Sequence, residues 1–178
     1  YVAGHSLIEN RSIESGVLCY WKLVHQFTDS RRSEAVTRIL VQLDCPSGMV
    51  YVPPGTTATS SITKPHDLHA FFIDQHLVSN AEYKVYVDET RCQPPKHWKN
   101  RTYALGRAQH PINFLNWEEA VEFSRWAGKR LPTESEWVRA AQGDDQRLWP
   151  WGNRYEETYC NCRHAGVMDT TPVNQHTV

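Results

Sequence analysis

The chain has 178 residues, and 19 Lys and Arg against 20 Asp and Glu leave a net charge of −1 at neutral pH. No basic stripe accompanies this balance, so the charge pattern of a nucleic-acid-binding protein is absent and we expect no nucleic-acid partner. No apolar run approaches the roughly 18–20 residues that a membrane span needs, so we expect no membrane partner either. The seven Trp and eight Tyr favour a fold in which large rings fill the spaces between irregular loops.

The cysteines and the first residue bear on where the protein is located. Five Cys, an odd number, do not form the regular framework of a small secreted protein. The sequence begins at Tyr1, with neither Met nor a signal peptide, so we expect it to be an excerpt of a longer protein. An excerpt does not reveal its own targeting signal. The localisation therefore stays unassigned, with the cytoplasm favoured.

Residues 1–46 are predicted to form a helical arm, or the tail of a preceding helical domain. Apolar residues recur at close to helical spacing across residues 12–27 and again across residues 33–43. The run Cys45-Pro46-Ser47-Gly48 then ends the second helix. We place the domain boundary here, so that residues 47–178 form the second unit.

Short strands and polar loops are predicted after Gly48. The predicted strands are residues 49–52, 70–74 and 111–115. Residues 56–63 are small and polar and are predicted to form a loop, and the stretch from Pro150 onwards is predicted to contain loops with short strands.

Three helices are predicted from three capping boxes, in which the side chain before the helix and a Glu three residues later cap each other's amides. The pairs are Ser79 with Glu82, Asn116 with Glu119, and Thr133 with Glu136. They open helices over about residues 80–89, 117–127 and 134–142, and Gly128 ends the second in a left-handed turn. Short strands, few helices and long loops together indicate an irregular α+β domain.

Two tryptophans are expected to pack around one corner of this domain, Trp126 at the end of the second helix and Trp137 in the third. Trp137 is expected to be buried together with Ala140 and Ala141. If so, Trp137→Ala costs about 3–5 kcal/mol through lost contacts and a cavity.

Several segments after residue 47 occur in an order typical of one family. They are residues 48–55 (GMVYVPPG), 71–83 (FFIDQHLVSNAEY), 110–120 (HPINFLNWEEA), 126–137 (WAGKRLPTESEW) and 150–153 (PWGN). Together they resemble the formylglycine-generating enzyme, or sulfatase-modifying factor, family over roughly residues 48–178. The helical arm lies outside the resemblance. The resemblance implies an irregular C-type-lectin-like fold with its C-terminal part absent from this sequence.

The resemblance also implies where catalysis resides. Family enzymes oxidise a sulfatase Cys to formylglycine with oxygen and with copper held by two thiolates near the C-terminal end of the domain. None of the five Cys here occupies those positions, so no catalytic residue is carried over. Copper is expected only if a further C-terminal part supplies the thiolates. Sulfoxide-forming relatives add an iron-binding His-x3-His-x-Glu motif, which the arm, with His5 and His25, does not contain.

One candidate metal site remains, at Cys160-Asn161-Cys162-Arg163-His164. The resemblance implies a structural calcium ion held by Asn161 and the Cys162 carbonyl. Asp169, whose spacing is not part of that pattern, is a candidate for a further oxygen donor. Two alternatives stay open. In an extended strand Cys160, Cys162 and His164 would face one side and could hold a transition metal, or all three are ordinary, partly buried side chains.

Three functions are compatible with these patterns. The favoured one is a non-catalytic module that recognises a ligand, a protein partner or neighbouring domains within a larger multidomain, regulatory protein. The first alternative is a truncated copper- and oxygen-dependent oxidase. The second is a diversified binding protein of lectin-like fold.

Overall fold

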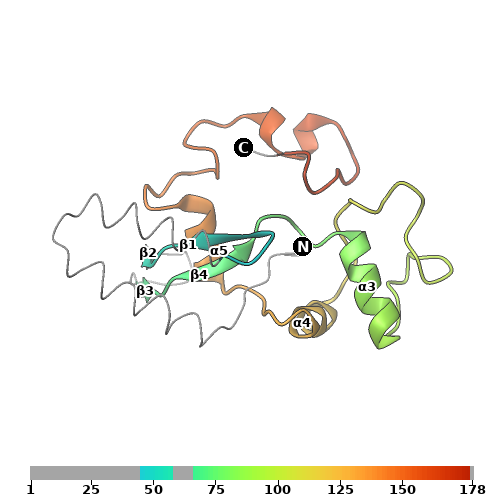
Figure 1. The fold of residues 1–178 in the computed structure, drawn as a ribbon. Coiled ribbons are helices and arrows are strands. Elements are labelled where there is room, and N and C mark those ends of the chain that lie inside the picture. The colour runs from blue at the N-terminus through green and yellow to red at the C-terminus, as the bar shows by residue number, and fades with distance from the viewer. Residues whose placement is uncertain (1–44, 58–65, 177–178) are drawn as a thin grey trace.

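The computed structural model describes residues 45–57 and 66–176, so the predicted helical arm lies outside the described residues. The elements follow in this order: β1 (Met49–Val52), β2 (Gly55–Thr57), β3 (His66–Leu68), β4 (Phe71–Asp74), α3 (Asn80–Thr90), α4 (Trp117–Trp126), α5 (Glu134–Gln142) and the 3₁₀ turns η1 (Glu157–Tyr159) and η2 (Arg163–Ala165). Figure 1 shows the small strands at the centre, with α3 and α4 beside them. The predicted α+β class is confirmed.

The strands form two antiparallel pairs. β1 pairs with β4, with Met49 opposite Asp74 and Val52 opposite Phe71, which confirms the strands predicted for these residues. β2 pairs with β3, so the predicted loop at residues 56–63 is wrong at its start. A short polar strand of this kind is stabilised by pairing with another strand, and the local composition does not indicate that pairing.

The strand predicted at residues 111–115 is also wrong. Pro111 makes only an isolated bridge with Ser79, and Phe114 adopts a left-handed φ of 57°, which ends any extended run. Phe114 is 78% exposed, so the alternation of apolar residues here does not reflect a strand buried on one face.

All three predicted capping boxes are confirmed. At the first, the Ser79 N–H donates to the Glu82 carboxylate over 2.7 Å while the Ser79 hydroxyl accepts from the Glu82 amide over 3.2 Å. Gly128 has a φ of 69°, as expected for the left-handed turn after α4. No helix within residues 45–57 and 66–176 is long and apolar enough to cross a membrane.

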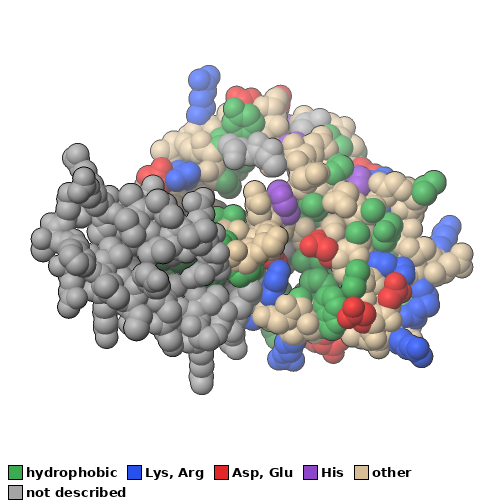
Figure 2. Space-filling view, viewed as in Figure 1, with side chains coloured by type: hydrophobic (Ala, Val, Ile, Leu, Met, Phe, Trp, Pro, Cys, Tyr) green, Lys and Arg blue, Asp and Glu red, His purple; other side chains and the backbone are tan. Residues whose placement is uncertain are grey.

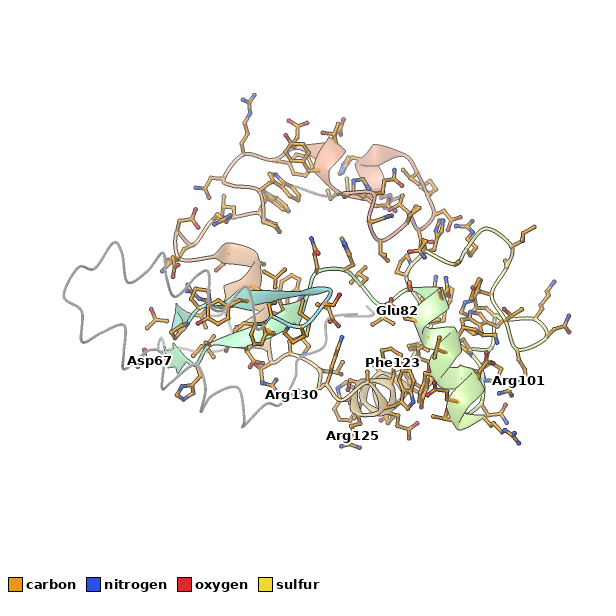
Figure 3. All side chains as sticks on the ribbon, in the orientation of Figure 1. Asp67, Glu82, Arg101, Phe123, Arg125 and Arg130 are labelled. Carbon is orange, nitrogen blue, oxygen red and sulfur yellow. The ribbon has the colours of Figure 1, made fainter. Side chains whose placement is uncertain are left out.

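The main core is aromatic and lies between α3 and α4. Its buried members are Tyr83, Tyr86, Val87, Trp98, Ile112 and Phe123. Phe123 of α4 points towards α3 (Figure 3), and its ring lies 5.3 Å from that of Tyr83 and 5.5 Å from that of Tyr86. Edge and stacked contacts of this kind add to the free energy gained from burial alone.

The expected burial of Trp137 is wrong, since this side chain is 48% exposed. α5 instead buries Ser135, Glu136 and Arg139. The Arg139 guanidinium lies over Gly55 of β2, where an added Cβ would come within 2.6 Å of it. The fully buried side chains of α5 are therefore polar, while Ala140 packs, partly buried, against the buried residues of β1 and β4.

Trp126 also differs from the predicted corner packing. Its ring contacts Tyr86 and Phe123, and its indole N–H donates to Glu89 over 3.2 Å. Trp126 therefore belongs to the rim of the core between α3 and α4.

Candidate functional site

The predicted site residues all lie in the segment after α5, which carries η1 and η2 and arcs over the rest of the fold (Figure 1, orange to red). One backbone bond joins its far end to the loop before α4, from the Val173 N–H to the Gln109 carbonyl over 2.8 Å. Side chains also tie these two parts of the chain together.

Arg107 and His110 anchor this segment. The Arg107 guanidinium pairs with the Asp169 carboxylate and also lies 3.0 Å from His110 Nδ1, which is 2.8 Å from the Thr170 hydroxyl. Because arginine can only donate, His110 Nδ1 is the acceptor in its contact with Arg107. The hydrogen bond from Arg107 lowers the pKa of Asp169 below its ordinary value.

Asn161 also ties the segment together. Its side-chain N–H donates to the Asp169 carbonyl over 2.7 Å and more weakly to Thr171 Oγ1 over 3.4 Å. Asn161 Oδ1 and the Cys162 carbonyl are the oxygens that the calcium prediction needs. The Asp169 carboxylate pairs with Arg107, and its Oδ1 accepts from the Thr170 N–H.

The extended strand assumed for residues 160–164 is wrong. Cys160 and Cys162 both have extended backbone angles, but His164 lies in η2. The Cys162 N–H donates to the Cys160 carbonyl over 3.1 Å, which closes a tight turn between the two cysteines. In the part of the chain that the structure describes, no group of three or more His, Cys, Asp or Glu gathers to hold a metal ion. The predicted triad of two thiols and an imidazole is therefore not formed.

The two thiols themselves do come together. The Cys162 thiol lies near enough to that of Cys160 to affect its pKa, and the Tyr155 hydroxyl lies 3.2 Å from Cys162 Sγ. Burial, and then the contact with Cys162, raises the pKa of Cys160. The hydrogen bond to Cys162 raises the pKa of Tyr155 to about 12. Cys160 and Tyr155 therefore both keep their protons at neutral pH.

A cluster of four aromatic residues precedes this turn, and no sequence pattern indicated that these rings would pack together. Trp149 and Gly152 exchange two backbone hydrogen bonds of 2.9 Å, and the rings of Trp149 and Trp151 stack 5.7 Å apart at an interplanar angle of 9°. Tyr155 packs on Trp149 and Tyr159 on Trp151. We call Trp149, Trp151, Tyr155 and Tyr159 the aromatic cluster. Trp151, Tyr155 and Tyr159 are four residues apart, as on one face of a helix, but the only helical element that the structure describes here is the short η1, so periodicity could not reveal the cluster.

The aromatic cluster is open to solvent. Trp149 is 38% exposed, Tyr155 44% and Tyr159 46%. Apolar side chains also reach the surface near α3 and α4, among acidic and basic groups (Figure 2), and Trp117 of α4 is 68% exposed. The surface thus presents large rings in more than one place, and those of the aromatic cluster are held by one another.

Comparison with known proteins identifies the family. Residues 40–176 match the family described as "Sulfatase-modifying factor enzyme 1-like domain". The chain belongs to this family. The resemblance drawn from the sequence motifs is therefore confirmed.

Relatives of this sulfatase-modifying factor domain carry different names. The chain is 54% identical to the formylglycine-generating enzyme of Thermomonospora curvata, with 60% of this chain and 52% of that protein covered. It is 49% identical to the formylglycine-generating enzyme of Bos taurus, over 50% of this chain and 35% of that protein. It is 31% identical to the serine/threonine-protein kinase pkn1 of Chlamydia caviae, over 60% of this chain and 19% of that protein. The chain spans about half, or less, of the length of these relatives.

The described residues of this sulfatase-modifying factor domain do not gather a ligand set for a catalytic copper. The Cys160 and Cys162 thiols are joined in one turn, but no third His, Cys, Asp or Glu gathers with them among the described residues. No catalytic step through copper is therefore assigned to this chain.

Proposed function

We propose that this domain is a non-catalytic recognition module that binds a polypeptide, either a separate protein or a neighbouring domain of the same parent chain. The observation that carries the proposal is the aromatic cluster, in which stacked Trp and Tyr rings are held in place while a large share of their surface faces solvent. Rigid aromatic side chains of this kind supply much of the binding free energy at protein interfaces, because they bury a large area and lose little conformational entropy.

The names of the relatives support a role inside a larger protein. A formylglycine-generating enzyme and a serine/threonine-protein kinase share this domain with the chain, so the fold alone does not fix an activity. In the kinase the matched part is only 19% of the protein. A domain that accompanies different activities is suited to contacting other domains or proteins, which is the regulatory role we infer.

The experiment is a selection of peptides from a random phage-displayed library on the immobilised 178-residue chain. We expect enriched peptides whose affinity falls at least about tenfold in Trp149→Ala, the loss typical of an aromatic hot spot. Val85→Ala is the matched control, because Val85 is an apolar residue of α3 that is 48% exposed and lies outside the aromatic cluster. No enrichment, or peptides that bind Trp149→Ala as well as wild type, would refute recognition by this surface.

A second candidate function is the oxidation of a sulfatase Cys to formylglycine. The 54% identity to a formylglycine-generating enzyme favours it, although its copper ligands would have to come from residues beyond those present here. The decisive assay incubates this chain with copper, oxygen and a Cys-containing sulfatase peptide and follows the peptide mass. We expect no aldehyde. Time-dependent aldehyde formation that Cys160→Ala or Cys162→Ala abolishes would overturn the non-catalytic function.

We also propose that calcium is a structural ion of the domain, bound by Asn161 Oδ1 and the Cys162 carbonyl together with water or further oxygens, since calcium takes six to eight oxygen ligands. Added CaCl2, compared with MgCl2, should raise the unfolding midpoint by about 2–4 °C. The gain should disappear in Asn161→Ala and persist in the control Asn153→Ala, whose side-chain oxygen accepts from the Leu148 N–H. An equal response to both salts would exclude the site.

A further inference from the structure

Cys160 and Cys162 are placed so that a bond between them needs little movement. Two residues of extended backbone span at most about 6.8 Å, which is within the Cα separation of about 4.4–6.8 Å that disulfides bridge. The turn closed by the Cys162 N–H and the Cys160 carbonyl holds the two residues close together. Both are thiols rather than disulfides and only partly buried, so a small oxidant can reach them.

We propose that Cys160 and Cys162 form a reversible dithiol–disulfide site whose co-substrate is a low-molecular-weight disulfide. One of the two sulfurs attacks a sulfur of the small disulfide, loses its proton to solvent and forms a mixed disulfide, while the first small thiol leaves. The second cysteine sulfur then attacks the protein sulfur of the mixed disulfide, and the second small thiol leaves. The site gives up two electrons and two protons, and the small disulfide is reduced to two thiols.

Two other cysteines of the chain, Cys45 and Cys92, can be compared with the pair. Cys45 and Cys92 are also partly buried thiols, but the Cys45 thiol contacts the carbonyls of Pro46 and Met49 and that of Cys92 interacts with Tyr86. Neither has a second cysteine two residues away, so attack on a small disulfide there is expected to stop at a mixed disulfide. Formation of an internal disulfide is thus the property that separates the pair from these two thiols.

The sequence allows the site to be isolated for mass spectrometry. Cleavage after Arg154 and Arg163 releases residues 155–163, which contain both cysteines of the site and no other. Cleavage after Arg91 and Lys96 releases residues 92–96 with Cys92 alone. The reduced 178-residue chain is incubated with glutathione disulfide, its remaining thiols are alkylated at intervals, and it is digested with trypsin.

We expect residues 155–163 to appear unalkylated and two hydrogen masses lighter than the reduced peptide, and to return to the alkylated form after treatment with a dithiol reductant. Residues 155–163 should lose both thiols together, with no lasting glutathionyl group, because the second step is intramolecular, whereas Cys92 should stop at a mixed disulfide. In Cys160→Ser and in Cys162→Ser, the remaining thiol should keep one glutathionyl group. One or two lasting glutathionyl groups on wild-type residues 155–163, or two thiols that stay open to alkylation while the single thiol of each Ser variant is glutathionylated, would refute the proposal.

Discussion

Glu136 is a buried carboxylate surrounded by donors at the start of α5. It is 8% exposed and accepts from both Arg130 nitrogens, at 2.8 and 2.6 Å, and from the Thr133 N–H at 2.8 Å. Burial by itself raises the pKa of Glu136, but the hydrogen bonds from Arg130 and Thr133 outweigh it and leave the pKa below the ordinary value. The charged form is therefore the one that the fold stabilises.

This lowered pKa has a definite sign in the stability of the protein. The contribution of Glu136 is complete above the pKa of the unfolded state, near 4.3, and is lost as the pH falls through the lower pKa of the folded state. We expect Glu136→Gln to reduce the free energy of unfolding by about 1–3 kcal/mol at neutral pH and to flatten its decline on the acid side. Urea unfolding across the acid range measures both. The exposed Glu118→Gln should change neither, and an unchanged acid slope in Glu136→Gln would contradict the assignment.

Tyr83 and Trp137 provide a direct test of which aromatic residue the fold depends on. Tyr83 is 2% exposed and contacts the rings of Tyr86, Trp98 and Phe123, so Tyr83→Ala should cost about 3–5 kcal/mol. Trp137 is 48% exposed, so Trp137→Ala should reduce the free energy of unfolding by about 1 kcal/mol, well below the loss expected from the sequence. Denaturant midpoints of the two variants measure both losses. Equal losses would show that Trp137 stabilises the fold more than its exposure indicates.

At the scale of elements, the caps define the helices independently of the core. Asn116 is an exposed residue whose side-chain oxygen accepts from the Glu119 amide over 2.8 Å. Asn116→Ala should reduce the free energy of unfolding by about 1 kcal/mol, because one amide at the start of α4 loses its partner. Asn116→Ser should retain most of the stability, since serine caps equally well. Thermal melts compare the two, and identical losses would mean that the cap contributes nothing.

The sequence predicted the helices well because their signals are local. Each of α3, α4 and α5 begins with a capping box whose partners are three residues apart, so the pattern and the structure concern the same few atoms. The two predicted strands of the β1–β4 pair were also recognisable. β2 and β3 were not predicted as a pair, because their residues are mostly small or polar and the two strands are separated by residues 58–65.

The candidate site was less predictable for a related physical reason. The segment that contains Cys160, Asn161 and Cys162 was located from the sequence, but the geometry there comes from a turn and from contacts with distant residues. The side-chain N–H of Asn161 donates to the Asp169 carbonyl. The Asp169 carboxylate in turn accepts from Arg107, 62 residues away in sequence. No periodic pattern encodes contacts of this range, and stacking within the aromatic cluster is equally invisible to periodicity.

At the scale of the whole molecule, the segment after α5 is held to the loop before α4 by a small polar network. It contains the ion pair between Arg107 and Asp169, the contact between His110 and Thr170, and the backbone bond from Val173 to Gln109. Individual exposed ion pairs contribute little. These three contacts hold the same short stretch of chain, however, so together they can set the free energy of its local opening without changing the free energy of global unfolding.

Arg107→Gln should therefore increase local opening of residues 160–176 while the core between α3 and α4 stays protected. Amide hydrogen exchange should accelerate by at least about threefold in this stretch and remain unchanged in Asn80–Thr90.

The pH dependence of wild type tests the same ion pair. Arg107 holds the pKa of Asp169 below its ordinary value, and a protonated carboxyl no longer pairs with the guanidinium. Lowering the pH through this pKa should therefore accelerate exchange of wild type at the same residues, relative to the intrinsic rate. Lys84→Met removes an exposed ion pair with Asp88 within α3 and should leave residues 160–176 unaffected. Unchanged protection there in Arg107→Gln, or an equal rise across α3, would show that the polar network does not govern this segment separately from the core.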